Sequence, residues 1–124
     1  MIAPPAVRRP ALAALALVLA AAAPAGAHAV LLRSSPARRA ILTAAPDRVQ
    51  LWFNEAIEPR FSTIGVVDAA GRPVDRGDAR VDPEDPKRLS IGLRPLGRGT
   101  YRVRFRVLSV DGHVVEGAFP FTLR

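Results

Sequence analysis

The chain has 124 residues, no cysteine, and 18 lysines and arginines against 11 aspartates and glutamates, which gives a formal charge of +7 at neutral pH. Without thiols, disulfide bonds and thiolate metal sites are excluded, so buried apolar side chains must hold the fold together. The positive charge is nearly all arginine, which reflects genome composition as much as a binding surface, so nucleic acid is not an expected partner.

Residues 1–27 have the organisation of a secretory signal peptide. Arg8 and Arg9 form a positive segment, residues 11–23 are uncharged and apolar, and small residues at 25–27 form a cleavage site. The apolar stretch is shorter than the roughly 20 residues that a transmembrane helix needs. We therefore expect cleavage and a periplasmic or secreted protein, exported by the Sec or the twin-arginine route; an uncleaved membrane anchor is the alternative.

Cleavage after this segment would make His28 the first residue of the mature chain. The remaining 97 residues, 28–124, carry a net charge of +5 and suffice for one small domain. An N-terminal histidine offers its free α-amine and its ring Nδ1, which together can close a chelate ring on a metal ion that favours nitrogen in a square plane.

Alternation with a period of two residues predicts a series of short strands. The apolar members of this pattern are Val49, Leu51 and Phe53; Leu89, Ile91 and Leu93; Tyr101, Val103, Phe105 and Val107; and Phe119, Phe121 and Leu123. We also assign Trp52 to the core, as is typical of aromatic residues in strands. Pro120 places the last strand at a sheet edge or a bulge.

Segments rich in glycine and proline separate these strands, at 69–72, 82–86 and 96–99. The polar segment 75–87 is predicted to be an exposed loop. The fold class is therefore all-β: a small antiparallel Greek-key barrel or sandwich, immunoglobulin-like or cupredoxin-like, with about seven strands.

Asp111 and His113 directly follow the strand predicted at 101–108. In an extended segment, side chains two residues apart project to the same face, so both can reach one ion. With the amine and imidazole of His28 they form a set of three nitrogens and one oxygen, which suits tetragonal copper(II). Taken alone, Asp111-Gly112 is also typical of an ordinary hairpin turn.

Two further features have a structural and a functional interpretation. Glu55 is a candidate to accept a hydrogen bond from a copper-ligating imidazole, although exposed surface is the commoner place for a glutamate. Arg102, Arg104 and Arg106 line one face of a strand, where they are solvated or contact an acidic partner.

Two segments carry a resemblance to a known family. The first is HAVLLRSSP at residues 28–36, followed by LWFNE at 51–55; the second is YRVRFRVLSVDGH at 101–113, followed by GAFPF at 117–121. From His28 to the end, the chain resembles the CopC family of periplasmic copper-binding proteins. The resemblance implies a Greek-key β-barrel that binds copper(II) through His28, Asp111 and His113.

The same resemblance implies a copper carrier or buffer in copper resistance and homeostasis, often alongside an inner-membrane CopD-type protein. We expect a monomer with one copper(II) per chain. Some family members resemble two-site proteins with a methionine-rich copper(I) site, but here the sole methionine, Met1, leaves with the signal peptide. Because soft thioether ligands are missing from the mature chain, we predict a copper(II)-only protein.

Two alternatives stay open. An N-terminal histidine with a second histidine also forms the histidine brace of copper monooxygenases. Asp111 would then fill a position that oxygen chemistry needs open, and 97 residues leave little room for a substrate face, so we expect a protein that is not an enzyme. The other alternative is an immunoglobulin-like interaction module without a metal.

Overall fold

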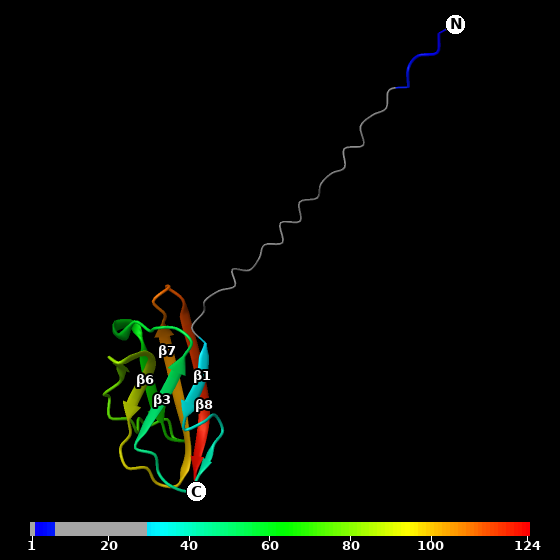
Figure 1. The fold of residues 1–124 in the computed structure, drawn as a ribbon. Helices are drawn as coiled ribbons and strands as arrows, with labels where there is room; N and C mark the ends of the chain where they lie inside the picture. The colour runs from blue at the N-terminus through cyan, green and yellow to red at the C-terminus, as the bar shows by residue number, and fades with distance from the viewer. Residues whose placement is uncertain (1, 7–29) are drawn as a thin grey trace.

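The computed structural model describes residues 2–6 and 30–124, and the second range forms two facing β-sheets (Figure 1). One sheet has the order β1 (Leu31–Ser35), β3 (Arg48–Phe53), β6 (Asp85–Gly92) and β5 (Arg80–Asp82). The other has the order β2 (Ile41–Leu42), β8 (Val114–Leu123), β7 (Gly99–Leu108) and β4 (Thr63–Val67). A 3-10 turn, η1 (Pro59–Phe61), precedes β4.

The chain crosses between the sheets several times. Strands β3 and β4 follow one another in sequence but lie in different sheets, as do β6 and β7. The pairings are antiparallel except for β2, which runs parallel to β8. This arrangement confirms the predicted all-β class as an open sandwich rather than a closed barrel.

The alternating apolar residues form the core between the two sheets. Every member of the four predicted sets is buried, and the polar residues between them face outward. Phe53 from one sheet and Phe105 from the other meet edge to face, with ring centroids 5.7 Å apart. Because β2 has only two residues, it is too short for the period-two pattern to predict.

The prediction for Trp52 was wrong. Leu51 and Phe53 on either side of it are buried, so the pleat of β3 turns Trp52 to the outer face, where it is partly exposed. The guanidinium of Arg33 lies 4.1 Å from the ring centroid, a cation–π contact that covers the indole. The strand period therefore decides the position, whatever the apolar character of the side chain.

The prediction of a loop at 75–87 was also wrong in part, because this segment contains β5 and the start of β6. The two strands join in a tight turn in which Asp82 Oδ1 accepts a hydrogen bond from the amide of Glu84, 2.9 Å away. Strand β5 lies at a sheet edge, so most of its side chains stay accessible and its sequence lacks a buried apolar alternation.

Strands β7 and β8 are the longest, with ten residues each, and form one hairpin. Their turn lies at the end of the sandwich where β1 begins (Figure 1). Strand β8 lies between β2 and β7 and is not the edge strand predicted from Pro120, but β2 pairs with it only at Thr122 and Leu123, so Pro120 stands outside that pairing. Within the described ranges, no helix has the length and apolar character needed to cross a membrane.

Candidate metal site

The β7–β8 turn brings Asp111 and His113 together. The Ser109 amide donates to the His113 carbonyl over 2.9 Å, and the Gly112 amide donates to the Ser109 carbonyl over the same distance. Gly112 has a φ of 92°, a left-handed conformation that glycine adopts at little cost. The sequence-based expectation of an extended segment was thus wrong, since the left-handed residue closes a turn at this point.

Within the turn, His113 Nδ1 lies 3.1 Å from Asp111 Oδ2. Both side chains are partly exposed, the imidazole to 46% and the carboxylate to 29%. The predicted pairing of the two residues is therefore present, at the accessible end of the sandwich and on a strand-to-strand connection held by backbone hydrogen bonds. A carboxylate and an imidazole at this separation can reach the same ion.

Ser109, for which the sequence predicted no role, is buried beside this pair. It is 1% exposed, and its hydroxyl contacts Asp111 Oδ1 and accepts a hydrogen bond from the His113 amide at 3.3 Å. The Ser109 hydroxyl is the main cause that lowers the pKa of Asp111 below its ordinary value; partial desolvation opposes this, and His113 adds to it. The feature of the sequence that could have indicated this contact is the position of Ser109, two residues before Asp111.

The segment 54–58 lies beside this turn. The Val110 amide donates to the Ala56 carbonyl over 3.1 Å, and the Glu58 amide donates to the Leu108 carbonyl over 2.8 Å. Glu55 is partly buried, and its Oε2 is enclosed without a hydrogen-bond partner among the described residues. An exposed surface position, the commoner interpretation of Glu55, therefore does not apply.

The start of β1 is tied to the same segment. The Val30 amide donates to Asn54 Oδ1 over 2.6 Å, and the Asn54 amide donates to the Val30 carbonyl over 3.1 Å. The predicted ligand His28 and the predicted signal peptide at 1–27 lie outside the described residues, apart from residues 2–6. In the part of the chain that the structure describes, no three potential metal ligands form a cluster.

Comparison with known proteins identifies the family to which the chain belongs. The profile of the CopC domain matches residues 31–124, the whole sandwich. The chain belongs to the CopC family. This CopC domain is also similar to the crystal structure of CopC from Methylosinus trichosporium OB3b, with a TM-score of 0.72 and 38% identity over 77% of this chain and 93% of that one.

Two other relatives differ in composition or size. The crystal structure of PcoC, a methionine-rich copper resistance protein from Escherichia coli, matches with a TM-score of 0.67 and 35% identity over 79% of this chain and 100% of that one. The copper transport protein CutJ of Bacillus subtilis is 33% identical over 98 residues, 78% of this chain. The CopC domain spans only 18% of the length of CutJ.

Proposed function

We propose that this CopC protein carries or buffers copper(II) outside the cytoplasm, in copper resistance and homeostasis. The observation that supports it most directly is the Asp111–His113 pair, held by Ser109 in the β7–β8 turn. The copper(II) ion would be the cargo, one per chain, bound by the amine and Nδ1 of His28 together with Asp111 and His113. Membership of the CopC family supports a binding protein rather than an enzyme.

The position of Val30 supports the contribution of His28. Val30 and Asn54 exchange two hydrogen bonds, and two residues further on Ala56 bonds to Val110 in the turn. His28 precedes Val30 by two residues, a reach of at most about 7 Å for extended chain. A histidine there could therefore approach the turn from the side of segment 54–58.

Glu55 supports the same arrangement. A buried carboxylate oxygen without a partner is unfavourable, so such an atom usually has a functional explanation. Ligating histidines generally donate their second N–H to a carboxylate or a carbonyl, which orients the ring and raises its basicity. We infer that Glu55 accepts such a hydrogen bond when copper is bound.

The donor set determines the oxidation state. Three nitrogens and one carboxylate oxygen suit tetragonal copper(II), whereas copper(I) prefers thiolates and thioethers. The chain has no cysteine, and its one methionine is Met1. The copper(II)-only site is therefore part of the proposal, in contrast to relatives described as methionine rich.

A membrane partner of the CopD type belongs to this proposal as well. The relative CutJ, named a copper transport protein, contains a segment like this domain within a much longer chain. A monomeric carrier in the periplasm could hand copper to a transport protein of that kind. The family of periplasmic relatives and the signal-like composition of residues 1–27 support the location.

Electron paramagnetic resonance tests the site. Protein beginning at His28 is titrated with copper(II) beside a version with one extra alanine ahead of His28, which removes the free amine from the ligand position. We expect a tetragonal, nitrogen-rich signal that saturates at one equivalent and changes in the extended version. Identical weak signals in both would contradict the proposal and favour an interaction module without a metal.

A further inference from the structure

The outer face of the β2-β8-β7-β4 sheet carries a row of arginines that the copper site does not use. Arg102, Arg104 and Arg106 alternate with the buried residues of β7, so all three are exposed on the same side. The row runs along the strand that leads into the Ser109–His113 turn. We call these three residues the arginine row.

The strand register places residues with small or no side chains beside Arg104, the middle residue of the arginine row. Arg104 pairs with Gly65 on β4 and with Ala118 on β8, neither of which rises to the height of the guanidinium. An open hollow of about 670 Å³ lies between Arg104 and Arg106, and a second of about 380 Å³ lies between Arg104 and Arg102. The two hollows share Arg104 and Ala118 and so form one shallow groove along β7.

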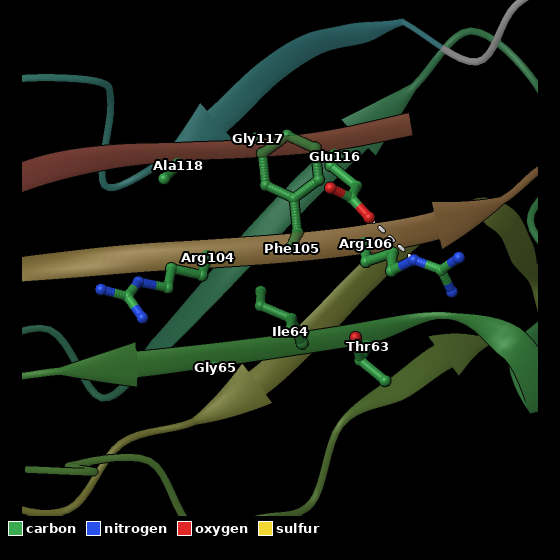
Figure 2. A pocket seen from close by; sticks show the side chains of 9 residues that line it. All are labelled: Thr63, Ile64, Gly65, Arg104, Phe105, Arg106, Glu116, Gly117 and Ala118. Carbon is green, nitrogen blue, oxygen red and sulfur yellow. Dashed lines mark hydrogen bonds and ion pairs between the residues drawn. The ribbon is translucent and has the colours of Figure 1, made fainter. Parts of the chain in front are cut away.

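The charges in this groove are unbalanced. Glu116 on β8 pairs with Arg106, Nε to Oε1 at 2.8 Å, whereas neither Arg102 nor Arg104 forms an ion pair with any described residue. Figure 2 shows Arg104 and Arg106 extending in opposite directions from β7, with Glu116 over Arg106 alone. The groove therefore holds three guanidinium groups against two carboxylates, Glu116 in the first hollow and Asp68 in the second, and of its arginines only Arg106 is ion-paired among the described residues.

From this geometry we propose that the arginine row binds an extended acidic segment of a partner protein. Alternate residues of an extended segment lie about 6.6 to 6.8 Å apart, which is also the backbone spacing of Arg102, Arg104 and Arg106 along β7. Carboxylates match the planar fork of arginine and form charge-assisted hydrogen bonds with it. The groove accommodates the backbone of such a segment because Gly65 and Ala118 leave room beside Arg104.

A membrane surface fits these observations less well. The residues paired with Arg102 and Arg104 are Val67, Gly65, Pro120 and Ala118, none of which is a large exposed apolar side chain. The exposed Ile41 and Val114 lie further along β2 and β8. Electrostatic adsorption to anionic lipid typically uses clusters of about four to eight basic residues, whereas the arginine row has three, one of them paired with Glu116. The proposal stands independently of the copper site, since it uses none of the residues assigned to copper.

The test measures binding of a fluorescein-labelled hexaglutamate peptide by anisotropy at low ionic strength, with hexaglutamine as the uncharged control. Arg104→Gln should weaken hexaglutamate binding about tenfold, the loss expected for one charge-assisted contact. The matched control is Arg80→Gln, which removes the same charge from β5 in the other sheet and should leave binding within about twofold. Glu116→Gln frees Arg106 and should tighten binding about threefold.

Nuclear magnetic resonance locates the contact. Titration with hexaglutamate should shift the amide signals of Gly65 and Ala118 and leave those of β5 in place. Equal weakening by Arg104→Gln and Arg80→Gln would overturn the proposal, because binding would then follow net charge alone. So would binding to phosphatidylglycerol vesicles without binding to the peptide, or no saturable binding of the peptide at all.

Discussion

Asp111 is held in place from two sides. Ser109, buried in the hairpin, contacts one carboxylate oxygen with its hydroxyl, and His113 Nδ1 lies beside the other at 3.1 Å. These contacts favour the ionised carboxylate and lower its pKa. The folded hairpin thus presents a charged carboxylate at this end of the sandwich.

This lowered pKa determines which groups control the pH dependence of copper binding. Between about pH 5 and pH 8 Asp111 stays ionised, so in the proposed site protons compete with copper(II) at the nitrogen ligands, above all at the α-amine of His28, whose ordinary pKa is near 7.7 to 8.0. Copper(II) affinity should fall steadily from pH 8 to pH 5, as measured by competition with a chromophoric chelator. Asp111→Asn should lower the affinity throughout but keep the slope; a constant affinity over this range would contradict the ligand set.

The lowered pKa of Asp111 also predicts how the stability of the fold depends on pH. A carboxylate whose pKa is lower in the folded state stabilises the fold above its unfolded pKa, and this contribution is lost as the pH falls through the folded value. For Asp111 the loss therefore lies below about pH 4, outside the range in which copper binding changes.

Glu55→Gln tests the role of the enclosed carboxylate. The substitution keeps the size of the side chain and removes its charge, so copper(II) affinity should fall about 10-fold to 100-fold, as for other partners of ligating histidines. Glu84→Gln, at an exposed turn, is the matched control and should leave the affinity unchanged. Equal affinities for the two variants, measured by chelator competition, would remove Glu55 from the site.

Among the elements, the β7–β8 hairpin contributes to both the core and the candidate metal site: its strands carry buried residues, and its turn carries Asp111 and His113. Its strands pair over ten residues, and near the turn Phe105 faces Gly117 across the ladder. A Cβ added at Gly117 would lie 2.4 Å from Cζ of the Phe105 ring. The ring is itself buried edge to face against Phe53, so it has little freedom to move away.

Gly117→Ala should therefore destabilise the protein by about 1 to 3 kcal/mol, the range for overpacking a dense core. Without the clash, alanine would stabilise the strand, because glycine loses more backbone entropy on folding. A fall in the free energy of unfolding therefore indicates overpacking, and a rise indicates the backbone effect. Gly97→Ala is the control, because a Cβ there meets open space. Urea unfolding measures both, and a Gly117→Ala variant as stable as the parent would show that the ring moves freely.

In the molecule as a whole, one core holds both sheets together without disulfide bonds. Phe121 is fully buried and stacks on Tyr101, with ring centroids 5.3 Å apart. Small domains are stable by only about 5 to 15 kcal/mol, so loss of one large core side chain takes away a large share of the total.

Phe121→Ala should lower the free energy of unfolding by about 3 to 5 kcal/mol. Phe61→Ala removes the same side chain from a position that is 62% exposed, and should change stability by less than about 1 kcal/mol. Urea denaturation of the two variants provides the comparison. Similar losses would mean that burial between the sheets does not dominate the stability.

Local pattern was enough to predict the four longest strands. Period-two alternation placed the core residues of β3, β6, β7 and β8 correctly, because side-chain direction in a strand depends only on position along the chain. The prediction failed at Trp52, which was assigned to the core although the alternation places it on the outer face. It also missed β2, which is too short to show the alternation, and β5, which is too polar.

The sequence by itself determined the all-β class, the buried face of each long strand and the pairing of Asp111 with His113, because each depends on residues close together in the chain. Only the tertiary structure decided that Gly112 closes a turn, that Ser109 holds Asp111, that one oxygen of Glu55 is enclosed without a hydrogen-bond partner among the described residues, and that Val30 is tied to Asn54. The first two depend on the backbone conformation of the turn, and the last two on hydrogen bonds and burial between segments distant in sequence, which no local pattern encodes.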